Sequence, residues 1–169
     1  MGDFKAGVLT ISDKGSRGER VDTSGPLIEE LIKNIGGHVV RYRMVPDEKD
    51  QIKEELCHMC DKLGITLILT TGGTGFAKRD VTPEATLEVI ERLVPGIPEA
   101  MRAASLQITP KAMLSRAQAG IRGNSLIINL PGSPKGVREN LEAILPALGH
   151  GIEILLGEAA ECAQDFDKP

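Results

Sequence analysis

The chain has 169 residues, 41% of them hydrophobic, which suits one compact domain with a substantial core. Its formal net charge is −4 and it holds no Trp, one Tyr and three Phe, so we expect no nucleic-acid partner that would need basic or stacking side chains. No apolar run is long enough to span a membrane and no N-terminal stretch has the form of a secretion signal, so we expect a cytoplasmic protein without a membrane partner.

Hydrophobic patterning and turn residues predict strands that alternate with helices. The expected strands are Phe4–Ile11, Val39–Val45, Thr66–Thr70 and a hairpin of Ala117–Ile121 with Leu126–Leu130. The expected helices begin at Ser24, Lys49, Thr82, Glu99 and Gly136. We expect Pro146 to separate the last helix from a final segment that ends near Leu156, because an interior proline removes a hydrogen bond.

This order of elements predicts an α/β fold, a three-layer sandwich with a mostly parallel sheet in which the hairpin makes one strand antiparallel. Residues 1–169 are expected to form a single domain, with a disordered tail from about residue 165. Cys57 and Cys60 lie inside an expected helix and have no second cysteine pair nearby, so we interpret them as ordinary helical residues in a reducing compartment.

A glycine-rich loop, Thr70–Gly75, directly follows the third expected strand. Glycines let backbone N–H groups turn toward an anion, and the following helix N-terminus adds the positive end of its dipole. Asp80 lies in the same loop, and a carboxylate beside a phosphate is repulsive unless a cation such as Mg²⁺ lies between them. The loop therefore predicts a metal–nucleotide site, although a tight connection without a ligand is the alternative.

The loop matches neither of two common phosphate-binding fingerprints. A P-loop would need Gly-Lys-Ser/Thr after the glycines, and the chain has Phe76–Arg79 there instead. The dinucleotide fingerprint would need a glycine where Lys78 stands. The site is therefore neither a Walker-type nor a Rossmann-type site.

Polar residues follow four of the expected strands. They are Ser12-Asp13, Pro46-Asp47-Glu48, the glycine loop through Asp80, and Pro131-Gly132-Ser133-Pro134-Lys135. Ligands of parallel sheets bind outside the carboxyl ends of strands, so we expect Asp13, Asp47 and Asp80 to converge on one crevice. Each also has an ordinary interpretation, since Asp47 and Thr82 are suited to cap the helices that follow them.

With these loops in order, the chain resembles the molybdopterin adenylyltransferases of molybdenum-cofactor biosynthesis, a family of bacterial enzymes and of equivalent domains in gephyrin and its plant counterpart. The matching segments are Thr10–Asp13, Asp22–Pro26, Val45–Glu48, Leu69–Gly75, Arg79–Ala85, Leu114–Arg116, Ala119–Gly123 and Leu126–Lys135. The resemblance runs nearly from end to end, and the ordered set of segments is specific to this family.

The resemblance implies transfer of AMP from Mg-ATP to the phosphate of molybdopterin, with release of pyrophosphate. It implies that Asp47 and Asp80 are catalytic and hold Mg²⁺. The nucleotide- and pterin-binding residues that it implies are Ser12, Asp13, Gly72, Gly73, Thr74, Gly75, Arg79, Pro131, Gly132 and Ser133. It also implies a homotrimer, and the adenylated product suggests a hand-off to a molybdate-inserting enzyme.

This reaction is consistent with the residue types. Attack of one phosphate on the α-phosphorus of ATP brings negative charges together, so positioning and charge neutralisation carry the catalysis and no protein nucleophile is needed. Lys78, Arg79 or Arg116 would hold phosphate oxygens beside the glycine loop. Two alternatives stay open: a non-catalytic molybdopterin-binding scaffold module of the same fold, and a phosphoanhydride hydrolase.

Overall fold

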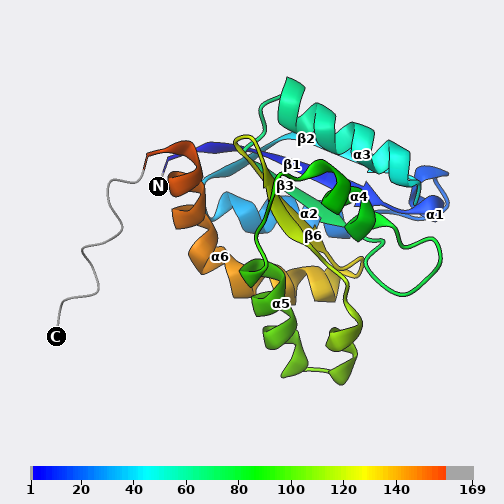
Figure 1. The fold of residues 1–169 in the computed structure, drawn as a ribbon. Coiled ribbons are helices and arrows are strands. Elements are labelled where there is room, and N and C mark those ends of the chain that lie inside the picture. Colours follow the sequence, from blue (N-terminus) through cyan, green and yellow to red (C-terminus); the bar gives the residue numbers. More distant parts are fainter. Residues whose placement is uncertain (1, 159–169) are drawn as a thin grey trace.

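The structure, a computed structural model, describes residues 2–158 of the chain. One six-stranded sheet lies between two layers of helices, which confirms the expected three-layer α/β sandwich (Figure 1). Within residues 2–158, no helix has both the length and the apolar character needed to cross a bilayer. The tail expected from about residue 165 lies outside the described residues.

The sheet has a mostly parallel order. Its strands are β1 (Phe4–Ile11), β2 (Gly37–Val45), β3 (Leu67–Thr71), β4 (Arg92–Leu93), β5 (Ala119–Arg122) and β6 (Ser125–Leu130), arranged as β2-β1-β3-β6-β5-β4. β1 pairs in parallel with β2 and β3, and β3 pairs in parallel with β6. β5 runs antiparallel to both β6 and β4, so the single antiparallel strand expected from the hairpin is confirmed. The two-residue β4 was not expected from the sequence.

The edge strand β2 contains one residue more than the stretch of β1 beside it. Ala6 pairs with Val39 while Gly7 pairs with Arg41, so Val40 has no partner across the ladder and is 53% exposed. Such a bulge adds one residue and bends the strand locally. From there on the two strands stay in register, and Ile11 pairs with the last residue of β2.

The helices cover the two faces of the sheet in separate groups. They are α1 (Asp13–Ser16), α2 (Ser24–Lys33), α3 (Lys49–Cys57) with its π-helical continuation η1 (His58–Lys62), α4 (Thr82–Val89), α5 (Gly96–Leu106), the 3₁₀ helix η2 (Pro110–Leu114) and α6 (Pro134–Leu156). Buried residues of α2, α5 and α6 share one hydrophobic cluster with the sheet, and those of α3, η1 and α4 share another. Figure 1 shows these two layers.

The prediction that Pro146 ends a helix is wrong, because α6 runs through it without interruption. The proline removes one hydrogen bond of the ladder, but burial on both sides of it holds the helix together. Ile144 and Leu148 flank the proline and are 4% and 3% exposed. The short α1 was also unexpected; it forms because the Ser12 side chain accepts a hydrogen bond from Gly15 N, 3.0 Å away.

Candidate active site

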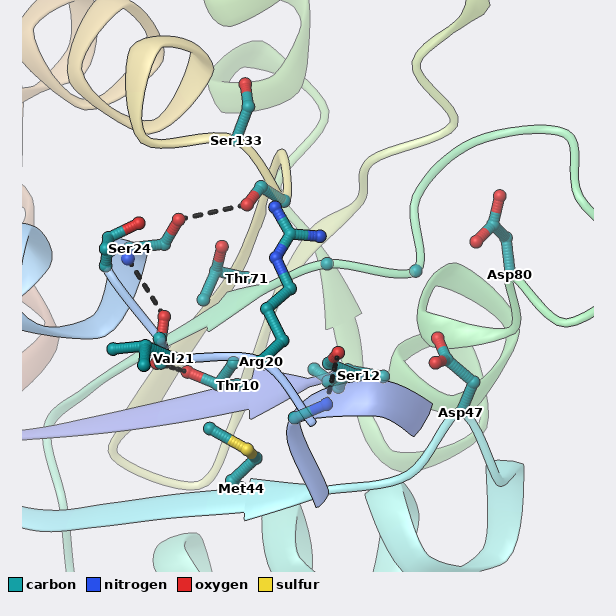
Figure 2. A pocket seen from close by; sticks show the side chains of 17 residues that line it. Thr10, Ser12, Arg20, Val21, Ser24, Met44, Asp47, Thr71, Asp80 and Ser133 are labelled. Carbon is teal, nitrogen blue, oxygen red and sulfur yellow. Dashed lines mark hydrogen bonds between the residues drawn. The ribbon is translucent and has the colours of Figure 1, made fainter. Parts of the chain in front are cut away.

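A cavity of about 390 Å³ opens at the carboxyl ends of β1 and β3 (Figure 2). The chain leaves β1 toward β2 and leaves β3 toward the opposite side of the sheet, so the cavity lies at the topological switch point where ligands bind in such folds. The loops expected to meet at this edge do meet. Those that line it contribute Ser12 after β1, Asp47 after β2, Gly72, Gly73 and Asp80 after β3, and Gly132 and Ser133 after β6.

The glycine loop presents unpaired backbone donors. In the described part of the chain, the N–H groups of Gly73, Thr74 and Gly75 donate to no acceptor. Gly73 has a φ of +66°, which side chains rarely adopt, and a Cβ on Gly75 would lie only 2.9 Å from Asp80 Oδ2. Glycine at positions 73 and 75 therefore lets the loop lie close to the acidic residues, and the three unpaired amides stay available to a bound anion.

Asp47 is fixed from two sides. Its Oδ2 accepts a hydrogen bond from Asp13 N over 2.9 Å, and its own N donates to Asp13 Oδ1 over 3.1 Å. The prediction that Asp47 caps the next helix is wrong, because Glu48 precedes α3 and the Asp47 carboxylate is used by Asp13 instead. A Cβ on Gly73 would lie 3.2 Å from Asp47 Oδ1, so this carboxylate also lies against the glycine loop.

Arg79 supports this arrangement from outside the cavity. Its Nε and Nη2 donate to the two carboxylate oxygens of Asp13, over 2.9 and 2.8 Å, and its Nη1 lies 2.8 Å from Glu48 Oε1. The hydrogen bonds from Arg79 hold the pKa of Asp13 below its usual value. Arg79 therefore joins the loop after β3 to the loops after β1 and β2, and keeps Asp13 charged beside Asp47.

Burial raises the pKa of Asp47 above its ordinary value, and the negative charges of Asp13 and Asp80 also raise it, against the opposing effects of the Asp13 N–H and of Arg79. Figure 2 shows Asp47 and Asp80 at the same end of the cavity. The expected convergence of three carboxylates on one crevice is therefore confirmed for Asp47 and Asp80, whereas Asp13 does not line the cavity. Two carboxylates at one end of a cavity repel each other, and a bound cation lowers this repulsion.

Asp80 is held by the turn that contains it and by an arginine behind it. Its Oδ2 accepts a hydrogen bond from Ala77 N over 2.9 Å. Arg116 donates from Nη2 to Asp80 O over 2.6 Å and from Nε to Gly75 O over 2.7 Å, and it forms an ion pair with Glu84. The Arg116 guanidinium therefore holds the glycine loop and the Asp80 turn in one conformation.

Three buried hydroxyls join the cavity loops to one another. Thr82 Oγ1 donates to Gly72 O over 2.9 Å, Thr71 Oγ1 donates to Pro131 O over 2.7 Å, and Ser24 Oγ donates to Gly132 O over 2.9 Å. The prediction that Thr82 caps α4 is wrong, because Val81 occupies the cap position and the Thr82 hydroxyl is used by the glycine loop. The loops after β3 and β6 therefore form one connected rim.

A second cavity, of about 510 Å³, lies on the other side of this rim. Thr74, Gly75 and Pro131 line it, and Ser133 lines both cavities. Ser105 of α5 also lines it, and its hydroxyl is buried without a hydrogen-bond partner within residues 2–158. A buried, unpaired hydroxyl is uncommon and leaves a polar group available to a ligand.

Comparison with known proteins identifies the family. A family model described as "Probable molybdopterin binding domain" matches residues 7–150. The molybdopterin adenylyltransferase of Helicobacter pylori strain J99 is 48% identical over 159 residues, which cover 93% of this chain and 90% of that protein. The chain belongs to the molybdopterin-binding domain family. The resemblance inferred from the sequence is confirmed.

Two further relatives also carry names that refer to molybdopterin. The molybdopterin adenylyltransferase of Escherichia coli K12 is 43% identical over 158 residues, covering 90% of this chain and 81% of that protein. The crystal structure of the molybdopterin biosynthesis enzyme MoaB from Thermus thermophilus superposes with a TM-score of 0.88 at 52% identity, covering 94% of this chain and 99% of that one. The fold of this family member therefore agrees with that of a solved relative.

The structure of this molybdopterin-binding domain divides the sequence-predicted residues into three groups. Those that line the first cavity are Ser12, Asp47, Gly72, Gly73, Asp80, Gly132 and Ser133, and those that line the second are Thr74, Gly75, Pro131 and again Ser133. Asp13 and Arg79 line neither cavity, but they position Asp47. The sequence-predicted site did not include Arg20 and Asp22, which line the first cavity from the loop after α1. The available signals were the polar character of this exposed loop and the matching segment that begins at Asp22.

The donor set fits Mg²⁺ that arrives with substrate phosphates. Within residues 2–158, no group of three or more His, Cys, Asp or Glu side chains is placed to hold a metal ion. Asp47 and Asp80 are therefore a pair of carboxylates without further protein ligands of these types. Mg²⁺ is commonly held in this way, by one or two carboxylates together with phosphate oxygens and water.

Proposed function

We propose that the chain is a molybdopterin adenylyltransferase of molybdenum-cofactor biosynthesis. It transfers AMP from Mg-ATP to the phosphate of molybdopterin and releases adenylyl-molybdopterin and pyrophosphate. The observation that carries this proposal is the meeting of Asp47 and Asp80 beside the three unpaired amides of Gly73, Thr74 and Gly75. The names of the relatives, two of which are adenylyltransferases, support it.

The reaction needs positioning more than it needs a protein nucleophile. A phosphate oxygen of molybdopterin attacks the α-phosphorus of ATP, the bond from that phosphorus to the β-phosphate oxygen breaks, and pyrophosphate takes the electron pair. The amides of the glycine loop donate to phosphate oxygens and orient them. Asp47 and Asp80 would hold Mg²⁺, which neutralises phosphate charge when it is bound.

The two cavities suit a reaction between two anions. Each is large enough for one substrate of this size, and both are bordered by Ser133. We place one substrate in each cavity, so that the reacting phosphates meet at the rim formed by the glycine loop and residues 131–133. The connections from Thr82, Thr71 and Ser24 keep this rim rigid, which favours in-line attack.

The decisive experiment is an adenylation assay. The purified chain, Mg-ATP and molybdopterin should release pyrophosphate and give adenylyl-molybdopterin of the correct mass. Asp80→Asn should lower the rate by about a hundredfold or more, because the neutral amide would hold Mg²⁺ beside the phosphates far more weakly than the carboxylate does. Asp50→Asn is the matched control, since Asp50 is exposed on α3 and lines neither cavity.

Other outcomes would select other functions. Tight molybdopterin binding with no pyrophosphate release would indicate the scaffold module. Cleavage of ATP without molybdopterin would indicate a phosphoanhydride hydrolase. Full turnover by the Asp80→Asn variant would remove Asp80 from the mechanism.

We further propose the setting in which this reaction occurs. The chain acts as a single domain over its 169 residues, assembles as a homotrimer, works in the cytoplasm and passes its product to a molybdate-inserting enzyme. The product contains a phosphoanhydride from which AMP is a good leaving group, so a following step that releases AMP fits the product. Light scattering coupled to size-exclusion chromatography tests the trimer, since a mass near 18.1 kDa would indicate a monomer.

A further inference from the structure

Residues 17–23 form a strap along one side of the first cavity. The strap joins α1 to α2, and Arg20, Val21, Asp22 and Thr23 from it line the cavity. Because four consecutive residues of the strap line the cavity, the strap borders the space that a substrate would fill.

Asp22 anchors the C-terminal end of the strap. Its Oδ2 accepts hydrogen bonds from Thr10 Oγ1, over 2.6 Å, and from the hydroxyl of Tyr42. Its Oδ1 accepts from Ser24 N over 2.9 Å and from Gly25 N over 3.1 Å. One carboxylate thus joins the strap to β1, β2 and the start of α2.

Asp22 and Tyr42 both have the protonation state that their hydrogen bond requires. Burial acts to raise the pKa of Asp22, but the hydrogen bonds from Thr10, Tyr42 and the backbone outweigh it and lower the pKa. Burial and the bond to Asp22 raise the pKa of Tyr42 to about 12. At neutral pH the carboxylate is therefore charged and the phenol keeps the proton that it donates.

The other end of the strap is also fixed. Glu19 N donates to Lys14 O and Gly18 N donates to Gly15 O, each over 2.9 Å, so backbone hydrogen bonds hold this end. Arg20 lies between these contacts and Asp22. Figure 2 shows its side chain extended from the strap across the cavity toward the loop that carries Ser133.

Arg20 differs from the arginines expected to hold phosphate. Arg79 is bound to Asp13 and Glu48, and Arg116 is bound to Glu84 and two backbone oxygens. The guanidinium of Arg20 has no hydrogen bond or ion pair to any other described residue. Among the described residues that line the first cavity, it is the one basic side chain.

We propose that Arg20 is a phosphate-binding residue of this cavity, held in reach of its ligand by the strap. The ligand class is a phosphate group of a substrate, either the polyphosphate of a nucleotide or a phosphate monoester. A planar guanidinium donates two parallel hydrogen bonds to such a group, which an ammonium does not. The inference rests on the proposed function for the identity of the two substrates, and it adds the cationic contact that the carboxylates and amides do not supply.

The test compares Arg20→Gln with Arg17→Gln in the full chain. Arg17 belongs to the same strap, is paired with Glu19 and does not line the cavity, so it is the matched control. Binding of ATP, inorganic pyrophosphate and molybdopterin is measured separately by titration calorimetry. Arg20→Gln should weaken at least one of them by about tenfold to a hundredfold, as expected for hydrogen bonds to a charged group, while Arg17→Gln changes none.

The pattern of loss identifies the bound phosphate. Weaker binding of ATP and pyrophosphate alone assigns Arg20 to the nucleotide, and weaker binding of molybdopterin alone assigns it to the phosphate monoester. Arg20→Lys should recover part of the affinity, because it restores the charge without the two parallel donors. A purely structural role would lower the melting temperature of the free variant and would not give this partial rescue.

These measurements distinguish failure of the proposed function from failure of the assignment of Arg20. If the chain binds ATP and molybdopterin without joining them, the proposed function fails while the assignment of Arg20 is still decided by affinity. If all three ligands bind the Arg20→Gln variant as tightly as the unchanged chain, the assignment of Arg20 is overturned whatever the activity is.

Discussion

The hydroxyl of Thr82 offers the sharpest test of how the glycine loop is held. Thr82 is fully buried and donates to Gly72 O over 2.9 Å, and no other donor within residues 2–158 reaches that oxygen. Thr82→Val keeps the shape of the side chain and removes the donor. The carbonyl of Gly72 is then left buried without a partner, which costs about 1–3 kcal/mol.

This loss converts into a measurable shift. Taking about 2 kcal/mol and a urea dependence of about 2 kcal/mol per molar, the midpoint of unfolding should fall by about 1 M. For a chain of 169 residues the melting temperature should fall by about 4–8 °C. The KM for ATP should rise in the same variant, because the amides that follow Gly72 lose their fixed orientation.

Thr82→Ser separates the hydrogen bond from the packing. Serine keeps the hydroxyl and loses one buried methyl group, which costs about 0.8 kcal/mol. Its KM for ATP should stay near that of the unchanged chain. Equal KM values in the serine and valine variants, or an unchanged urea midpoint in Thr82→Val, would show that the hydroxyl does not hold the loop.

Three further changes test the acidic residues and their surroundings. Asp47→Asn should abolish transfer and raise the melting temperature at pH 7. The pKa of Asp47 is raised in the folded chain, so the unchanged chain loses stability as the pH rises through that pKa, and the neutral amide avoids this loss. The difference in melting temperature should vanish near pH 3, where the aspartate is protonated in both states. Asp22→Asn should do the opposite in thermal melts, because a lowered folded pKa gives stability that is present at neutral pH and lost on acidification. Gly75→Ala should lower the rate of transfer by about tenfold or more with little change in melting temperature, since its Cβ would lie 2.9 Å from Asp80 Oδ2, whereas Gly96→Ala, whose Cβ would meet nothing within 4 Å, should leave the rate unchanged.

Features that depend on local patterns were predictable from the sequence. The apolar run Phe4–Ile11 gave the first strand with the bounds that the structure has. The hairpin followed from a turn between two apolar segments. The meeting of Asp47 and Asp80 followed from a general property of parallel sheets, whose strand ends gather at one edge.

Features that depend on which hydrogen-bond or ion-pair partner a side chain has in the folded structure were not predictable from the sequence. The Thr82 hydroxyl has a suitable helix start beside it, yet it bonds to Gly72 O at the far end of the connection between β3 and α4. Arg79 and Arg20 look alike in sequence, and only the folded chain shows that one is paired and the other faces the cavity unpaired. Pro146 is tolerated because tertiary burial outweighs the lost hydrogen bond, a balance that local propensity does not contain.

The extra residue in β2 determines how far along the sheet edge Asp47 lies relative to Asp13. Asp47 follows the end of β2, and its carboxylate must meet Asp13 N at 2.9 Å, just beyond the end of β1. If Val40 were paired in a regular ladder, every later residue of β2 would lie about 3.3 Å further along β1. That displacement exceeds the length of the hydrogen bond between Asp13 and Asp47. The bulge at Val40, on an edge strand and well away from the cavity, therefore sets the position of Asp47 beside Asp13.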